Sequence, residues 1–161
     1  MMALKKHLIC PMLLSIILLL CACAPPFETD APMTHFSFSH SGMHLGLMYT
    51  LSACRTETGW KAELSLLAGD REYTLDMTDE DVHCLEELIQ RNNLKAWAGF
   101  DKVDRRALDG TSFSLSIDFE DGERLYAEGS NAFPKGYADA HNDIRTYFEK
   151  LMERNGIENP M

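Results

Sequence analysis

The sequence has few basic residues for its length, and this limits the partners it can bind. Its 161 residues include 15 Lys and Arg against 25 Asp and Glu, which gives a formal net charge of −10. A surface of this sign repels nucleic acid and anionic lipid headgroups. We therefore expect no nucleic-acid binding, and solubility above a charged membrane is the simplest role of the charge.

The sequence also lacks the motifs that mark common enzymes. It contains no Gly-x-Ser-x-Gly, no nucleotide-binding glycine loop and no His-Glu-x-x-His. Nucleophilic catalysis needs a base beside the nucleophile, and no spacing along this chain indicates such a pair. We expect a protein that is not an enzyme and has no cofactor. A small metal-dependent or hydrolytic enzyme of the cell envelope is the alternative.

Cysteine is scarce beyond the N-terminal segment. Of the five cysteines, only Cys54 and Cys84 lie after residue 23. In an oxidising compartment they could close a disulfide worth roughly 3 kcal/mol, provided that the geometry allows it. Cys54 ends a strand pattern and Cys84 lies early in a helix pattern, so two separate half-buried thiols are the alternative.

The only long apolar run lies at the N-terminus. Lys5 and Lys6 precede roughly a dozen apolar residues, which small residues follow, as in a secretory signal. The stretch from Leu8 to Ala24 is at the lower limit for a membrane-spanning helix, and Pro25-Pro26 ends it. The pattern favours a cleaved signal over a permanent membrane span.

The segment Leu20-Cys21-Ala22-Cys23 resembles the lipobox of bacterial lipoproteins. The resemblance implies that residues 1–22 are a signal peptide cut after Ala22, and that Cys23 is lipidated. Two or three acyl chains meet the requirement for stable anchoring. We expect a lipid-anchored extracytoplasmic protein in the cell membrane or outer membrane; the alternatives are an ordinary signal peptide cut near Ala24 or an uncleaved anchor.

The remaining chain is long enough for one hydrophobic core and too short for two typical domains. Residues 23–34 comprise the lipidated cysteine and a proline-rich tether without periodicity. Such a tether spans up to roughly 30 Å if it is polyproline-like. We therefore predict a single domain over residues 35–155.

Alternating apolar residues predict a sheet. Period-two patterning marks a strand with one buried face. The pattern occurs at Phe36 and Phe38, at 43–53 after a turn at Ser41-Gly42, at 60–66, at 73–77 after a turn at 68–71, and in a hairpin over 112–127. Asp121-Gly122 in this hairpin has the composition of a two-residue turn.

Two segments have helical periodicity instead. Thr78 is a suitable N-cap, the acids that follow it suit the positive end of a helix, and Arg91 to Asn93 suit its end. Leu94, Trp97 and Phe100 then form an apolar exit segment that we expect to cover the sheet, and residues 101–110 read as a polar loop. A last helix is predicted over 136–154.

This order of elements predicts an α+β fold. An antiparallel sheet of about five to six strands, with two amphipathic helices packed on one face, is the economical arrangement because no strand–helix–strand crossover is required. Serines line the opposite face of the sheet, which we expect to meet solvent or a partner.

The chain carries one wider resemblance. It rests on residues 94–102, on Leu108-Asp109-Gly110-Thr111-Ser112-Phe113-Ser114-Leu115, on Asp121-Gly122, on Gly129-Ser130-Asn131-Ala132-Phe133-Pro134 and on the opening residues 36–43. These segments resemble a group of small bacterial proteins of gut-associated bacteria that are frequently lipid-anchored and have no assigned activity. The resemblance covers about residues 35–152 and implies one domain without catalytic or ligand residues.

Two groups of residues have side chains that bind metals. His35, His40 and His44 could approach one another around a turn, but their spacing matches no zinc motif. Asp101, Asp104 and Asp109 could bind calcium, but Lys102, Arg105 and Arg106 lie among them and oppose a cation. We therefore expect no metal site and interpret both groups as surface residues.

The segment before the last helix is the best candidate for a small ligand. Free amides at a helix start can hold an anion, and the candidate residues are Ser130, Asn131 and Lys135. Ordinary turn and capping chemistry is the alternative. The hypothesis that follows is a non-catalytic binding or envelope-interaction module. Its partner would be an envelope protein or a glycan, bound by the open sheet face or by this loop.

Overall fold

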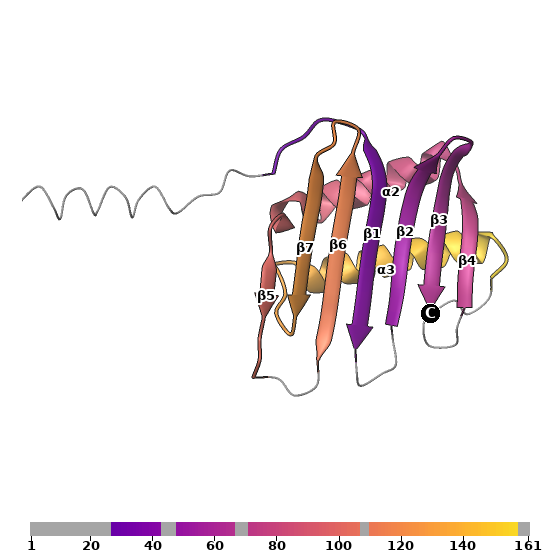
Figure 1. Cartoon of the computed structure of the whole chain (residues 1–161). Coiled ribbons are helices and arrows are strands. Elements are labelled where there is room, and N and C mark those ends of the chain that lie inside the picture. Colours follow the sequence, from indigo (N-terminus) through magenta and orange to yellow (C-terminus); the bar gives the residue numbers. More distant parts are fainter. Residues whose placement is uncertain (1–26, 43–47, 67–70, 107–109, 158–161) are drawn as a thin grey trace, which may run out of the picture.

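The computed structural model describes residues 27–42, 48–66, 71–106 and 110–157. They form a seven-stranded sheet, two α-helices and a short 3-10 helix (Figure 1), so the predicted α+β class is confirmed. The elements in chain order are β1 (Met33–Gly42), β2 (Met48–Thr56), β3 (Gly59–Leu66), β4 (Arg71–Met77), α2 (Asp79–Arg91), η1 (Leu94–Trp97), β5 (Asp101–Val103), β6 (Thr111–Phe119), β7 (Arg124–Ser130) and α3 (Tyr137–Arg154).

The strand order is β4-β3-β2-β1-β6-β7-β5, which places the first strand of the chain at the centre of the sheet. Six of the strands form antiparallel ladders, and β5 runs parallel to β7 at one edge. The prediction of five to six strands is too low because β5 lies in the segment read as a polar loop. Its three residues are all exposed, so it carries no alternation of buried and exposed positions.

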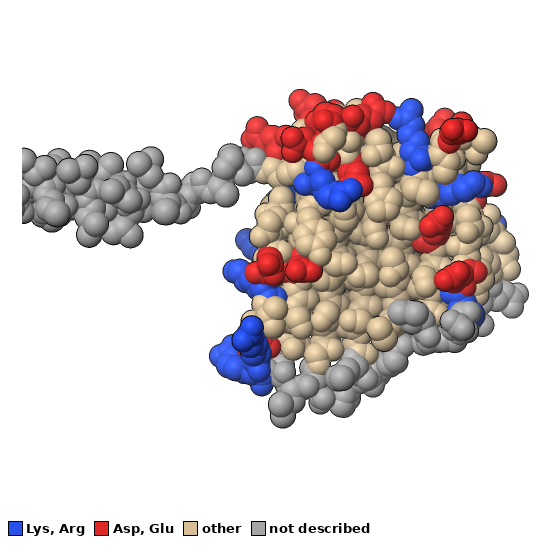
Figure 2. All heavy atoms as spheres, in the orientation of Figure 1, with Lys and Arg blue, Asp and Glu red and all other residues tan. Residues whose placement is uncertain are grey.

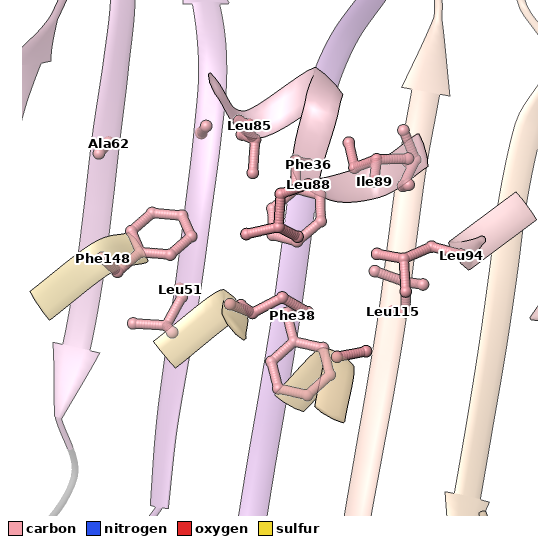
Figure 3. Close-up of a cluster of buried hydrophobic side chains, with 14 of the residues drawn as sticks. Phe36, Phe38, Leu51, Ala62, Leu85, Leu88, Ile89, Leu94, Leu115 and Phe148 are labelled. Atoms are coloured by element: carbon pink, nitrogen blue, oxygen red, sulfur yellow. The ribbon is translucent and has the colours of Figure 1, made fainter. Parts of the chain in front are cut away.

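The core lies between one face of the sheet and the helices. Figure 1 shows both helices behind the sheet, crossing its strands. Phe148 of α3 stacks on Phe36 of β1 at 6.2 Å between ring centroids, and Leu85 and Leu88 of α2 are buried beside them (Figure 3). Leu94 and Trp97 of η1 are also buried, as expected of an apolar segment that covers the sheet.

Helix α2 begins where its sequence predicts. The Thr78 hydroxyl accepts a hydrogen bond from the Asp81 amide at 3.3 Å, and the Asp81 carboxylate accepts one from the Thr78 amide at 2.7 Å. This reciprocal pair is a capping box, which satisfies backbone donors that an α-helix leaves free at its start. The helix ends at Arg91 with Asn92 as C-cap.

The N-terminal segment of the domain corrects the predicted boundary at residue 35. Strand β1 already begins at Met33, and the Phe27 ring packs against Phe119 at 5.6 Å between centroids. The Thr29 hydroxyl donates to Asp121 at 2.6 Å, and Lys95 Nζ donates to the Thr29 carbonyl at 2.5 Å. Residues 27–32, here called the strap, are therefore held on the domain rather than belonging to a free tether.

Two predicted turns are also corrected. Ser41 and Gly42 are still part of β1, where Ser41 pairs with Met48 and Gly42 with Thr111. At the turn around Asp121-Gly122, only Gly122 has a positive φ, of 84°, and the Phe119 amide donates a hydrogen bond to the Glu123 carbonyl. A two-residue type I′ turn needs positive φ at both central residues, so the loop is the longer form that ends in a left-handed glycine.

Several predictions fall outside the described part of the chain. These are the signal peptide over residues 1–22, the lipidated Cys23 and the turn at 68–71 apart from Arg71, which is the first residue of β4. Within the described ranges, no helix has the length and apolar character needed to cross a bilayer.

Candidate binding face

Every serine beyond Ser15 lies on the face of the sheet that points away from the core. These residues alternate along their strands with buried apolar residues, which fixes the direction of both sets. We call this surface the serine face. Its serines are Ser37, Ser39, Ser41, Ser52, Ser65, Ser112, Ser114, Ser116 and Ser130.

The strand register arranges the hydroxyl groups in rows across the sheet. Ser39 lies between Thr50 of β2 and Ser114 of β6, and Ser37 lies in the same way between Ser52 and Ser116. Neighbouring strands are about 4.8 Å apart, so the rows place one hydroxyl on each central strand at that interval. Ser39 and Ser114 are hydrogen-bonded at 2.7 Å through their hydroxyl oxygens. The rows are therefore continuous across the middle of the sheet.

Charged side chains lie at the margins of the serine face. Figure 2 views this face and shows an uncharged central area bordered by acidic and basic groups. Lys61 pairs with Asp76 at 2.7 Å, and Arg124 pairs with Asp118 at 2.5 Å. Arg55 pairs with Glu120 in the same way. These cations are neutralised by their partners, so the serine face presents no free positive cluster among its described residues.

Two shallow hollows lie on the serine face, one on each side of β1. A hollow of about 310 Å³ over β2, β3 and β4 is lined by the hydroxyls of Thr50, Ser52, Ser65 and Thr74 and by the carboxylates of Glu63 and Glu72. The other, of about 220 Å³ over β5, β6 and β7, includes Ser112, Ser130, Asp101, Glu128 and Lys102. Both hollows combine hydroxyl groups with carboxylates.

Tyr126 is the one exposed aromatic residue on the described part of this face. It is 47% exposed and lies opposite Ser116 in the ladder between β6 and β7. Its hydroxyl donates a hydrogen bond to Glu128 at 2.6 Å, which raises the pKa of the phenol. The bond ties the tip of the side chain and leaves the ring surface open.

The structure places the three ligand candidates differently. Ser130 lies on the serine face, where its hydroxyl accepts from Ser112 at 3.1 Å. Asn131 has a left-handed backbone, with φ of 52°, and its side chain accepts from the Thr111 amide at 2.9 Å. Lys135 is exposed, and its carbonyl accepts from the Trp97 indole at 3.3 Å. Asn131 thus works as a link between β6 and the end of β7, and ligand binding by the three residues stays a prediction.

The histidines do not converge. His35 lies on the serine face, 3.7 Å from the Asp118 carboxylate, whereas His40 lies on the core side of β1, and His44 is outside the described residues. Among the described residues there is no group of three metal-binding side chains. Asp104 is bonded to Arg106, which lowers the pKa of that carboxyl group, and Asp109 is also outside the described ranges.

A cluster that the sequence does not predict surrounds His40. His40 Nδ1 is 2.9 Å from the Tyr137 hydroxyl, and His141 Nε2 is 2.5 Å from the Tyr49 hydroxyl. The two imidazole rings are 4.5 Å apart between centroids. Burial, followed by the charges of His40 and Arg145, lowers the pKa of His141 to about 4; burial also lowers the pKa of His40. The cluster is an uncharged contact between α3 and the first two strands.

The disulfide considered from the sequence is not formed. Cys54 and Cys84 are both free thiols. Cys54 lies on the serine face beside Lys61 and Glu63, whereas Cys84 is exposed on α2, which packs behind the sheet. A disulfide requires Cα atoms within about 7 Å, which the intervening sheet prevents.

No family model, curated protein or solved structure matches this chain.

Proposed function

We propose that this protein is a membrane-anchored extracytoplasmic lipoprotein, and that it acts as a non-catalytic module that binds an envelope partner through the serine face. The observation that carries the proposal is the gathering of all the serines beyond Ser15 on one uncovered side of the sheet. The anchor rests on the resemblance of residues 20–23 to a lipobox.

The composition of the serine face supports binding over mere exposure to water. Antiparallel sheets commonly leave one face solvated, and that face needs only polar residues. Here the central strands carry short hydroxyl side chains, whereas the charged residues lie at the margins (Figure 2). Covering charges with a partner costs far more free energy than covering hydroxyls that regain hydrogen bonds. The centre of the face can therefore be covered at low cost.

The anchor is tested by the chemistry of the N-terminus. Mass spectrometry of the protein from native membranes is expected to show a chain that begins at Cys23 with acyl groups attached. The Cys23→Ala variant is expected to leave the membrane fraction. An unmodified Cys23 in native material would contradict this part of the proposal.

The binding face is tested by photo-crosslinking in the native cells. A benzoylphenylalanine in place of Ser116, in the middle of the serine face, is expected to capture a partner. The same group in place of Thr146, on α3 at the opposite layer, is the matched control and is expected to capture none. Equal capture from both positions, or capture from Thr146 alone, would remove the serine face from the proposal.

A further inference from the structure

We infer that the occupant of the serine face is an uncharged polysaccharide chain that lies across the strands and enters both hollows. This inference rests on the proposed function, because it names the partner class of the same face. It is carried by the lining of the two hollows, by the exposed ring of Tyr126 and by the charges around them.

The lining of the hollows matches the chemistry of sugar hydroxyls. A serine or threonine hydroxyl offers one donor and two acceptor positions, and a carboxylate accepts at both oxygens. The hollow over β2–β4 combines four such hydroxyls with Glu63 and Glu72. The hollow over β5–β7 combines Ser112, Ser130 and the donor Lys102 with Asp101 and Glu128. Sugars carry neighbouring hydroxyls that donate and accept in the same way. The hollows and a bound sugar could therefore satisfy each other's hydrogen-bond donors and acceptors.

The charges select an uncharged polymer. The chain has a net charge of −10, and none of the four carboxylates in the hollows, those of Glu63, Glu72, Asp101 and Glu128, forms a salt bridge among the described residues. An anionic polymer would be repelled by this field. A cationic polymer would find no acids in the central rows between the hollows, which consist of Ser37, Ser39, Ser41 and their partners.

A protein partner fits the face less well. Protein interfaces are depleted in serine, and their energetic centres are enriched in Trp, Tyr and Arg. The centre of the serine face has none of these three residue types among its described positions. Of its exposed large apolar residues, Met48 lies opposite Ser41 at the end of β2, and Val103 lies on the edge strand β5. The face therefore has the polarity of a glycan surface rather than that of a protein interface.

Tyr126 supplies the apolar contact that such a ligand needs. A pyranose ring has a face of C–H groups that packs on an aromatic ring, and Tyr presents a large rigid surface with a polar tip. The Tyr126 hydroxyl is tied to Glu128, so the ring is positioned before the ligand arrives. It lies at the end of the row that Ser37 and Ser116 form across β1 and β6.

The dimensions of the face suit an extended chain. Seven strands at about 4.8 Å intervals make the sheet roughly 29 Å wide. The row Ser65–Thr50–Ser39–Ser114 runs from the first hollow to Glu128 in the second, without a charged residue between them. An extended polysaccharide of several units could contact both hollows and the hydroxyl row together.

Affinity electrophoresis of the full lipidated protein in detergent tests the inference. The gels contain a neutral glucan, mannan or galactan, and polygalacturonate and poly-lysine serve as charged probes. We expect retardation by at least one neutral polysaccharide and none by polygalacturonate; poly-lysine attracts the acidic chain as a whole, so its retardation is expected to be the same for the Tyr126→Ala variant. Tyr126→Ala is expected to weaken the retardation at least tenfold, and Tyr126→Phe is expected to retain most of it because the ring remains.

Matched variants separate binding from folding. Phe133→Ala removes the other exposed aromatic ring of the described residues, in the loop before α3, and is expected to leave retardation unchanged. Ser37→Ala with Ser116→Ala removes hydroxyls from the central row and is expected to weaken retardation, whereas Thr146→Ala on α3 is not. Circular dichroism spectra identify any variant that fails to fold.

The outcomes distinguish this inference from the proposed function. No retardation by any neutral polysaccharide, or retardation by a neutral polysaccharide that Tyr126→Ala leaves intact, would overturn the polysaccharide. If Ser116→benzoylphenylalanine nevertheless captures a protein in cells, the proposed function stands with a protein partner. If neither experiment gives a signal, both are overturned.

Discussion

Asp81 connects three parts of the molecule through one carboxylate. It closes the capping box of α2 with Thr78, and both of its oxygens accept from Arg154 at the end of α3, at 2.6 and 2.7 Å. The side chain is only 9% exposed, and the bonds to Arg154 are the main reason that its pKa falls to about 2. A buried carboxylate with this many donors is stabilised in its charged form.

The Asp81→Asn variant should therefore be less stable at neutral pH. Charge-assisted hydrogen bonds contribute about 1.5–3 kcal/mol, and we expect a loss of about 2 kcal/mol in the free energy of unfolding. Because the folded pKa lies below the ordinary value of 3.8, this contribution is complete above pH 3.8 and is lost as the pH falls towards 2. Urea unfolding of both proteins at pH 7 and pH 2 measures the difference; a gap that persists at pH 2 would contradict it.

Gly129 is a second residue whose identity is restricted by its neighbours, because they leave no room for a side chain. A Cβ atom at this position would lie 2.7 Å from Phe113 Cε1 and in contact with the Ala132 carbonyl. We expect Gly129→Ala to lower the free energy of unfolding by about 2 kcal/mol, because the backbone must move to relieve the overlap. Gly42→Ala in β1 is the matched control, since its Cβ meets nothing closer than 3.7 Å. Equal losses in the two variants would contradict the packing argument.

At the scale of elements, the contact between α3 and the first two strands depends on uncharged histidines. The folded protein holds the pKa of His141 at about 4 and also lowers that of His40, whereas the unfolded chain has the ordinary value of 6.5. The unfolded chain therefore takes up more protons between pH 6.5 and pH 4. The free energy of unfolding therefore falls as the pH drops through this range.

Thermal unfolding at several pH values tests this dependence. We expect Tm to fall by several degrees from pH 6.5 to pH 4, and His141→Gln should reduce the slope because it keeps a polar contact with Tyr49 but cannot be protonated in this range. His83→Gln is the control, since His83 is exposed on α2. A slope that His141→Gln leaves unchanged would assign the pH dependence to other groups.

The helices and strands differ in how well the sequence predicts them. Helix α2 was predictable because Thr78 and the acidic residues after it are a local signal of a helix start. Strand β6 was predictable because its alternating residues indicate which side is buried and which side carries the serines. Strand β5 was not, because its pairing with β7 comes from tertiary structure rather than from its own exposed residues.

The sequence likewise predicts one part of the candidate site and not the other. The serine pattern predicted an open polar face, but the two hollows, the tie between Tyr126 and Glu128 and the contact between His40 and His141 join residues far apart in the chain. No spacing in the sequence indicates them.

At the scale of the whole molecule, the strap would determine how the proposed lipid anchor orients the domain on a membrane. Phe27 is docked on Phe119, so only Ala24, Pro25 and Pro26 separate it from the proposed lipid on Cys23. Four residue steps span no more than about 14 Å. The end of the sheet at the turn between β6 and β7 would thus face the bilayer. The serine face would then be roughly perpendicular to the plane of the membrane.

Energy transfer to a labelled lipid tests this orientation. A fluorophore at Glu123→Cys, near the strap, is expected to transfer more efficiently to a headgroup acceptor in vesicles than one at Arg106→Cys, at the opposite end of the sheet. Cys54 and Cys84 are replaced by serine in both proteins. Equal transfer from the two positions would show that the domain turns freely on its anchor.

The position of β1 also has a consequence for the order of assembly. This strand emerges first, yet it needs β6 as its neighbour, and Ser39 and Ser114 are separated by 75 positions along the chain. Contacts between such distant residues slow folding, because a long loop must close before they form. If the chain is exported as proposed, its core could therefore be completed only after most of the polypeptide has crossed the membrane.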